Sequence, residues 1–280
     1  MTASDPPAGI RSVAILGLGL IGGSLARDLA ARGIRVLASD RDGRSVRDAM
    51  LQRIATPLVH GEQPDVVILA LPVRAALEAV ALMDDRFGRA RLIMDVGSTK
   101  LSIVEAAEGM GLGPRFVGSH PLAGDHRSGW EASRTGLFDG ARVFLAPAPS
   151  AGTEALQLAR ELWAMVGGVP EMIGAAEHDR RLAWTSHLPQ MVSSALAAAL
   201  ADEGVARAEL GPGGRDVTRL AGSSPAMWTD IGRDNAQEII PALDRMVAKV
   251  REIRDALRNG DGARLQSLLT AARDWHGEEG

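Results

Sequence analysis

The first 174 residues alternate short, continuously apolar segments with amphipathic helical patterns. The apolar segments have the length of strands and little polar alternation, which is typical of strands buried on both faces. A helical pattern over residues 21–32 follows the first of them. Strands separated by helices predict a parallel sheet covered by helices on both faces. The predicted strands are residues 11–16, 34–39, 65–70, 91–96, 115–119 and 142–146.

The pattern changes after about Gly174. Strand-like segments stop, and Ala-, Leu- and Met-rich helical patterns cover residues 177–201, 235–258 and 263–275. Pro225 starts a shorter helix, since proline is favoured in a first helical turn. We therefore expect an α/β domain over residues 1–174 and an all-helical domain over residues 175–280. No Pro-, Gly- or Ser-rich linker separates them, so the junction should be packed.

Composition removes several kinds of chemistry. The 280 residues include no cysteine, which excludes disulfides, thiolate catalysis and cysteine-ligated metals. They include no tyrosine, which excludes a tyrosine acid or base, and only two lysines, Lys100 and Lys249. The net charge of −4, without a Lys/Arg-rich run, argues against nucleic acid, and no apolar run is long enough for a membrane helix. We expect a cytoplasmic protein without a metal site.

A glycine motif stands between the first predicted strand and the helix that follows it. The spacing G-x-G-x-x-G allows a tight turn, a close approach of the backbone to a pyrophosphate, and close packing of the helix on the strand. The free N–H groups at the helix N-terminus then favour the phosphates. The arrangement predicts a Rossmann-type nucleotide-binding domain. The motif is Gly17-Leu18-Gly19-Leu20-Ile21-Gly22.

Asp40 ends the second predicted strand, at the distance from the motif where an acid binds the ribose. Its carboxylate would accept hydrogen bonds from both ribose hydroxyls of NAD and repel the extra phosphate of NADP. Arg41 leaves NADP open, because a guanidinium beside the ribose could bind that phosphate. Leu71 and Pro72 follow the next strand and should line the cofactor site at the same sheet edge, with an ordinary loop as the alternative.

A dehydrogenase that oxidises an alcohol needs a base, and histidine is the natural one in a chain without tyrosine. His120 follows a predicted strand, and Ser98 occupies the matching place after the neighbouring strand, so both should converge on the carboxyl edge of the sheet. His187 lies in a long predicted helix beside Pro189, which would free backbone groups and kink that helix. Arg215 and Arg219 are suited to binding a carboxylate. For each of these, a buried or solvated side chain without a catalytic role is the alternative.

Five segments carry a further signal: GLGLIGGSLA at residues 17–26, DVGSTK at 95–100, GSHPLAGDHRSGWEASRTGLFDG at 118–140, HDRRLAWTSHLPQMVSSAL at 178–196 and RDVTRLAGSSPAMWTDI at 215–231. In this order, and over most of the chain, they resemble the prephenate/arogenate dehydrogenase family of tyrosine biosynthesis. The resemblance implies a nucleotide-binding domain followed by a helical domain that mediates a homodimer. It also implies NAD(P)-dependent oxidative decarboxylation of a cyclohexadienyl substrate, which for prephenate gives 4-hydroxyphenylpyruvate.

The resemblance implies roles for individual residues. His120 would hydrogen-bond the C4 hydroxyl of the substrate and accept its proton, with Ser98 assisting from the other side. Arg219 would bind a substrate carboxylate, and Ser186 and His187 would line the pocket.

Three positions near the expected substrate bear on its identity. Gln190 stands where many relatives have a second histidine, and Asp125 and His126 stand where some have Thr-Glu. Loss of a cationic group there could favour a zwitterionic amino-acid side chain, so arogenate is an alternative substrate and an aminodeoxyprephenate a further one. Trp228 is similar to a family position that reaches into the partner subunit's site, with a buried tryptophan of the dimer core as the alternative.

Two other functions share part of this pattern. The β-hydroxyacid dehydrogenases use a lysine on a helix of the second domain, but no lysine lies between Lys100 and Lys249, which disfavours that class. A non-catalytic NAD(H)-binding sensor would need the dinucleotide site without His120, Ser98 and Arg219 together. Their joint presence favours an enzyme.

Overall fold

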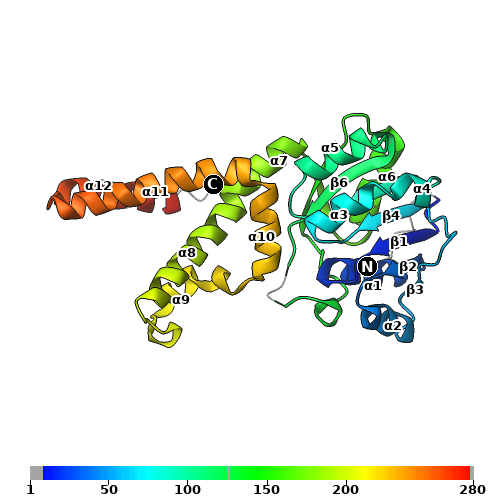
Figure 1. Ribbon diagram of the computed structural model, residues 1–280, viewed down its shortest axis with the longest axis horizontal. Coiled ribbons are helices and arrows are strands. Elements are labelled where there is room, and N and C mark those ends of the chain that lie inside the picture. The colour runs from blue at the N-terminus through cyan, green and yellow to red at the C-terminus, as the bar shows by residue number, and fades with distance from the viewer. Residues whose placement is uncertain (1–8, 125–126, 278–280) are drawn as a thin grey trace.

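The computed structural model describes residues 9–124 and 127–277. Its first half contains one eight-stranded sheet with the strand order β3-β2-β1-β4-β5-β6-β7-β8 (Figure 1). All six strands predicted from the apolar pattern are present, which confirms the Rossmann-like α/β domain. The strands are β1 (Ser12–Leu16), β2 (Arg35–Ser39), β3 (Thr56–Pro57), β4 (Val66–Leu69), β5 (Leu92–Asp95), β6 (Phe116–Pro121), β7 (Arg142–Pro147) and β8 (Val169–Met172).

The sheet departs from the predicted all-parallel arrangement at one place. β7 pairs antiparallel with β6, whereas the other neighbours pair parallel. In the described part of the link between them, the only regular element is the single 3₁₀ turn η2 (Trp130–Ala132). A parallel partner needs a crossover, usually through a helix, and the described residues of this link form no α-helix that could cross back over the sheet. The chain therefore turns back on itself beyond β6.

Two strands were not predicted, and both are short edge strands. β3 has two residues, and β8 contains Pro170 and Glu171, so neither shows an apolar run. Proline and charged residues are tolerated at a sheet edge because no further strand must pair there.

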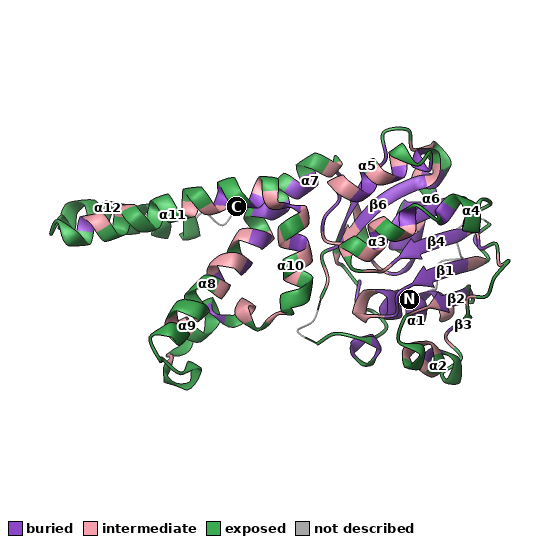
Figure 2. Ribbon diagram, in the orientation of Figure 1, coloured by how far each residue is buried: buried purple, intermediate pink, exposed green. Residues whose placement is uncertain are grey.

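Different helices cover the two faces of the sheet. Alternate residues of β1 point to opposite sides, so Val13 and Ile15 join one core cluster while Ala14 and Leu16 join the other. Figure 2 shows this buried interior concentrated around the sheet. α1 (Leu20–Ala30) and α6 (Thr153–Met165) cover the first side, and α3 (Val73–Val80), α4 (Met83–Phe87) and α5 (Leu101–Gly109) cover the second, while α2 (Gly43–Leu51) links β2 to β3.

The second half is helical throughout its described residues, as predicted. Its predicted long first helix is divided by a π-helical turn, η3 (Ala183–His187). Figure 1 shows α11 and α12 projecting away from the sheet. The α-helices are α7 (Ala175–Leu182), α8 (Leu188–Asp202), α9 (Pro212–Val217), α10 (Pro225–Asp234), α11 (Ala236–Arg258) and α12 (Gly262–Gly277).

Hydrogen bonds tie the two halves together. The carboxylate of Asp179 on α7 accepts hydrogen bonds from the backbone N–H groups of Lys100 at 2.8 Å and Leu101 at 2.9 Å, at the start of α5. Ser102 donates its hydroxyl to Asp234 on α10 at 2.8 Å. The junction is therefore packed, as expected for halves without a flexible linker. Within residues 9–124 and 127–277, no helix is both long and apolar enough to span a bilayer.

Candidate functional site

The glycine motif forms the turn between β1 and α1. Gly17 has a φ of +98°, and its N–H donates to the carbonyl of Ser39 at 2.7 Å. A Cβ at Gly17 would collide with the carbonyl oxygen of Ala70, and one at Gly22 would collide with the carbonyl oxygen of Gly17. A Cβ at Gly19 would meet nothing within 4 Å. The first and third glycines are thus required by packing, and the second leaves the backbone open to a ligand.

The rest of the turn fits a dinucleotide. Gly19 caps α1 without any side-chain hydrogen bond, so the first N–H groups of this helix, from Leu20 onward, are available to phosphate oxygens. Leu71 lies against Gly17, and Pro72 caps α3 on the same edge of the sheet. Leu18, Leu20 and Ile21 lie in the turn and the first helical residues, as the motif predicts.

Asp40 is joined directly to this turn. Its Oδ2 accepts a hydrogen bond from the backbone N–H of Leu18 at 2.6 Å, and its Oδ1 accepts one from Asp42 at 2.8 Å. A carboxylate offers about four lone-pair directions, so both oxygens keep capacity for ribose hydroxyls. The neighbouring Arg41 is exposed.

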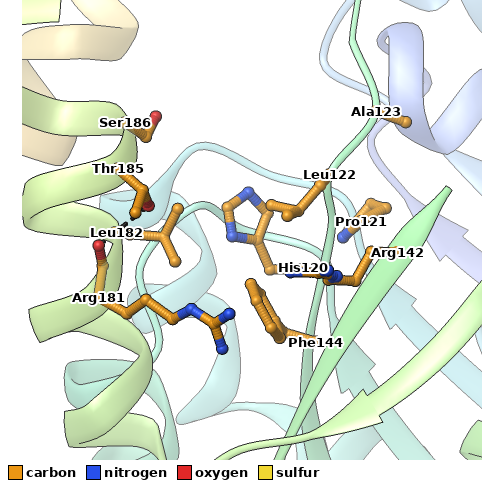
Figure 3. A pocket seen from close by; sticks show the side chains of 10 residues that line it. All are labelled: His120, Pro121, Leu122, Ala123, Arg142, Phe144, Arg181, Leu182, Thr185 and Ser186. Carbon is orange, nitrogen blue, oxygen red and sulfur yellow. Dashed lines mark hydrogen bonds between the residues drawn. The ribbon is translucent and has the colours of Figure 1, made fainter. Parts of the chain in front are cut away.

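His120 lies inside β6, one residue before its end, because this strand runs two residues further than predicted. It stands opposite Phe144 of β7. Its ring borders a cavity of about 390 Å³ between these two strands on one side and α7 and η3 on the other (Figure 3). Thr185 and Ser186 of the π-helical turn line the opposite wall. The cavity therefore lies between the two halves of the chain.

A chain of three hydrogen-bonded groups leads away from this cavity. Nδ1 of His120 lies 2.9 Å from Nε2 of His178, and Nδ1 of His178 lies 2.7 Å from Oδ1 of Asp179. Burial, followed by the nearby His178, Lys100 and His187, holds the pKa of His120 well below its usual value. Burial likewise lowers the pKa of His178. Both imidazoles are therefore neutral near pH 7.

Asp179 stays ionised behind them. Burial alone would raise the pKa of this carboxyl, but hydrogen bonds from His178 and from two backbone N–H groups outweigh burial and lower it.

His187 is connected to the same hydrogen-bond network through the side chain of Asn235. Asn235 donates one amide hydrogen to the backbone carbonyl of Asp179 at 2.8 Å, and its nitrogen lies 3.1 Å from Nδ1 of His187. Burial lowers the pKa of His187 to about 4. Trp228 packs edge-to-face on this ring, with centroids 5.8 Å apart. The structure thus brings His187 and Trp228 together behind the cavity wall.

Ser98 lies in the loop after β5, on the edge next to β6, as predicted. The same loop leads to Lys100, which is fully buried and pairs with Asp95. Ser119 donates its hydroxyl to the backbone carbonyl of Asp95 at 2.6 Å, which ties β6 to β5. No hydrogen bond between Ser98 and His120 is present in the described chain, so the assisting role of Ser98 stays a prediction.

Two other predicted substrate residues lie elsewhere. Gln190 is buried and donates its amide hydrogens to Ser194 at 3.1 Å and to the carbonyl of Leu220 at 2.9 Å. Arg219 lines a second cavity of about 390 Å³ in the helical half, together with Arg207. Neither borders the cavity at His120, and their substrate contacts stay predictions. His126 lies outside the residues that the structure describes.

Several residues at the cavity were not predicted from the sequence. Arg142 and Arg181 line it, and both pair with Glu171, at 3.1 and 3.4 Å. Figure 3 shows their side chains on either side of Phe144. No sequence pattern distinguished Arg142 from the many other arginines, and for Arg181 the only signal was its place in a segment that resembles the family. His178 had one signal, since it begins a segment that resembles the family. In the described ranges, no group of acidic and histidine side chains is arranged to hold a metal ion.

Comparison with known proteins identifies the family. The model of the prephenate dehydrogenase nucleotide-binding domain matches residues 25–172, and that of the prephenate dehydrogenase dimerization domain matches residues 174–271. A cyclohexadienyl dehydrogenase of Zymomonas mobilis is 33% identical over 264 residues, which cover 90% of each chain.

Solved structures agree with this result. A prephenate dehydrogenase of A. aeolicus in complex with hydroxyphenyl propionate and NAD⁺ has a TM-score of 0.88 and 30% identity, covering 96% of this chain and 98% of its own. A Synechocystis arogenate dehydrogenase has a TM-score of 0.79 and 26% identity, with 95% and 99% covered. The chain therefore belongs to the prephenate dehydrogenase family, whose members are NAD(P)-dependent oxidoreductases.

Proposed function

We propose that this chain converts prephenate to 4-hydroxyphenylpyruvate, with NAD as the hydride acceptor. The observation that carries the proposal is the neutral imidazole of His120, which borders a cavity at the edge of the sheet that also bears the glycine turn. A base at that edge can act on an alcohol whose carbon faces the cofactor. The crystal structure of the A. aeolicus relative in complex with hydroxyphenyl propionate and NAD⁺ supports this substrate class.

His120 takes up one proton during the reaction and returns it at the end. His120 accepts the proton of the C4 hydroxyl while the hydrogen on C4 leaves as hydride, and a C4 ketone forms. The ring carboxylate then leaves as carbon dioxide, its bonding electrons enter the ring, and the ketone oxygen becomes a phenolate. The protonated His120 returns its proton to that oxygen. NAD supplies only the hydride acceptor, and formation of the aromatic ring favours the products.

The two arginines fit the charge of this substrate. Prephenate carries two carboxylates, and Arg142 and Arg181 present guanidinium groups at the cavity, with one carboxylate, Glu171, between them. Guanidinium groups bind carboxylates through paired hydrogen bonds. We propose that one of them binds a carboxylate of the substrate. Ser186 lines the same wall and would place its hydroxyl near the ring.

Arogenate is the second candidate, and Gln190 favours it. This neutral side chain stands where a second histidine is common among relatives, and its amide hydrogens already bond within the helical half. Gln190 does not border the cavity at His120, but at this position the chain offers no cation to the keto-acid side chain of prephenate, whereas the zwitterionic side chain of arogenate needs none.

A kinetic assay with all four combinations of prephenate or arogenate and NAD or NADP tests the proposal. We expect the highest kcat/KM with prephenate and NAD. A higher value with arogenate would assign the second function, and turnover of neither substrate would refute both.

We also propose that the enzyme is a homodimer formed through its helical half. The family model of this half is a dimerization domain. α12 buries no residue within one chain, and α11 and α12 expose large apolar side chains that a second copy could cover. These exposed side chains are Ile240, Val247, Val250, Ile253, Leu257, Leu269 and Trp275. Light scattering coupled to size-exclusion chromatography should give twice the chain mass of 29.4 kDa.

A further inference from the structure

We propose that His178 and Asp179 are positioning residues that fix the tautomer of His120, so that its Nε2 keeps a lone pair for the substrate hydroxyl. The inference deepens the proposed function and rests on it for the role of His120 as base. Neither residue touches the cavity, so both would act through His120.

The ionised carboxylate of Asp179 can only accept hydrogen bonds. Its Oδ2 accepts from Leu101 N–H at 2.9 Å, and its Oδ1 accepts from Lys100 N–H at 2.8 Å. The third partner of the carboxylate is Nδ1 of His178, at 2.7 Å from Oδ1. A charge-assisted bond of this length requires a hydrogen on that nitrogen. His178 therefore carries its proton on Nδ1.

His178 is neutral near pH 7, because burial lowers its pKa. A neutral imidazole with its hydrogen on Nδ1 has a lone pair on Nε2. This Nε2 lies 2.9 Å from Nδ1 of His120, so Nδ1 of His120 must donate. The remaining nitrogen of His120, Nε2, then carries no hydrogen and is the basic atom of the ring.

The opposite arrangement would require a cationic His178, which would donate to His120 and move its proton to Nε2. The surroundings disfavour that cation. His178 is buried, and burial is the largest cause of its lowered pKa, to which the ammonium of Lys100 adds. The charged or titratable groups that face it are Asp179 from its own helix, Asp95 from the end of β5, Lys100 from the loop that follows, and His120 and His187.

Packing holds the two rings in this geometry. The rings of His120 and His178 lie edge-to-face with centroids 5.1 Å apart, and Phe144 lies edge-to-face on His178 at 5.6 Å. His178 and Asp179 belong to α7 of the helical half, whereas His120 belongs to the sheet. The docking of α7 on α5 thus sets the proton arrangement of the base.

The same hydrogen bonds stabilise the His120 cation that forms during turnover. When His120 takes the substrate proton on Nε2, its Nδ1–H still donates to His178, and the carboxylate of Asp179 offsets the charge. The proton does not pass along this chain, because it returns from Nε2 to the phenolate oxygen.

Nitrogen NMR of the full-length enzyme labelled with ¹⁵N-histidine tests the tautomer without any turnover. The spectrum of His120→Asn identifies the His120 signals by their loss. We expect Nε2 of His120 to give the signal of an unprotonated nitrogen and Nδ1 that of an N–H at pH 7.5. The reverse assignment would overturn the proposal even if the enzyme converts prephenate. Lack of turnover with the expected tautomer would instead refute only the proposed function.

Three variants test the contribution of His178 to rate. His178→Leu removes the acceptor and should lower kcat about 10- to 100-fold with an unchanged KM for NAD, because a mixture of His120 tautomers leaves less base in the correct form. His178→Gln restores an acceptor oxygen and should recover most of kcat. His60→Leu, at an exposed histidine, is the matched control and should leave kcat unchanged.

Equal loss in His178→Gln and His178→Leu, with an unchanged His120 spectrum in both, would show a merely structural contribution of His178. If His178→Leu does not fold, the spectra of the wild type and of His178→Gln still decide the tautomer.

Discussion

The carboxylate of Asp40 accepts a hydrogen bond from the backbone N–H of Leu18, at 2.6 Å, and so joins the end of β2 to the glycine turn. The side chain predicted to bind the ribose thus also shapes the turn predicted to bind the phosphates. Changes at Asp40 should therefore affect both the affinity for NAD and the choice between NAD and NADP.

For Asp40→Ser we expect the KM for NAD to rise about 10- to 100-fold, the loss expected for hydrogen bonds to a charged group. The KM for NADP should fall, because the repulsion of its phosphate is removed. Initial rates with both cofactors measure the two effects. The double variant with Arg41→Ala is the control, since loss of that exposed guanidinium should reverse the gain with NADP. A wild type that already prefers NADP would contradict the assignment of Asp40.

His120→Asn should lower kcat by about 10²- to 10⁴-fold, the range for loss of a general base. Affinity for NAD, measured by fluorescence titration, should stay unchanged because His120 lies on β6 and not in the glycine turn. The low pKa of His120 also predicts that kcat/KM of the wild type persists below pH 6.5, where an ordinary histidine would already be protonated. Near-normal kcat in His120→Asn would exclude its role as base.

The sequence predicted those parts of the fold and site that depend on local pattern. The apolar runs located the six main strands, and the glycine spacing located the turn whose packing excludes a side chain at Gly17 and Gly22. Pro189 predicted an irregular helix, and the π-helical turn just before it accommodates the missing N–H of that proline. The side chain of His120 was placed at the correct edge of the sheet.

What the sequence could not predict depends on packing between distant segments. The contact of His178 with His120 joins residues 58 positions apart and exists only because α7 docks on α5. Arg181 reaches the cavity by the same docking. β7 runs antiparallel to β6 because the described part of the link between them forms no crossover helix. The apolar pattern of the strands does not indicate strand direction.

The low pKa of His187 makes the stability of the fold depend on pH. In the unfolded chain histidine binds a proton near pH 6.5, whereas in the folded protein His187 does so only at about 4. The unfolded state therefore binds more protons between these values, and the free energy of unfolding falls as the pH falls. Between pH 7 and pH 5 the contribution of His187 is about 2 kcal/mol.

Urea denaturation at pH 7 and pH 5 measures this loss. His187→Gln, which can still contact Asn235, is the control and should show a pH dependence smaller by about the same 2 kcal/mol. An equal pH dependence in both proteins would contradict a neutral, buried His187.

Arg181 and Arg219 line different cavities, so their substitutions separate two models of substrate binding. If a carboxylate binds at the cavity beside His120, Arg181→Met should raise the KM for prephenate about tenfold with little change in kcat. Arg219→Met should then leave KM unchanged. The opposite result would favour the role that the family resemblance implies for Arg219, and Arg207→Met, at the second cavity, is the matched control.

Gln190→His tests what sets the choice between prephenate and arogenate. A histidine at this buried position could donate to the carbonyl of Leu220, as Gln190 does at 2.9 Å, and would add a group able to carry positive charge. If that group faces the side chain of the substrate, kcat/KM for prephenate relative to arogenate should rise about tenfold, the value of one charge-assisted hydrogen bond. Competition between the two substrates in one assay measures the ratio directly.

Gln190→Leu is the control, because leucine has a similar volume without hydrogen-bonding groups. It should lower both rates by loosening α8 without changing their ratio. An unchanged ratio in Gln190→His would place the specificity of the enzyme elsewhere in the pocket.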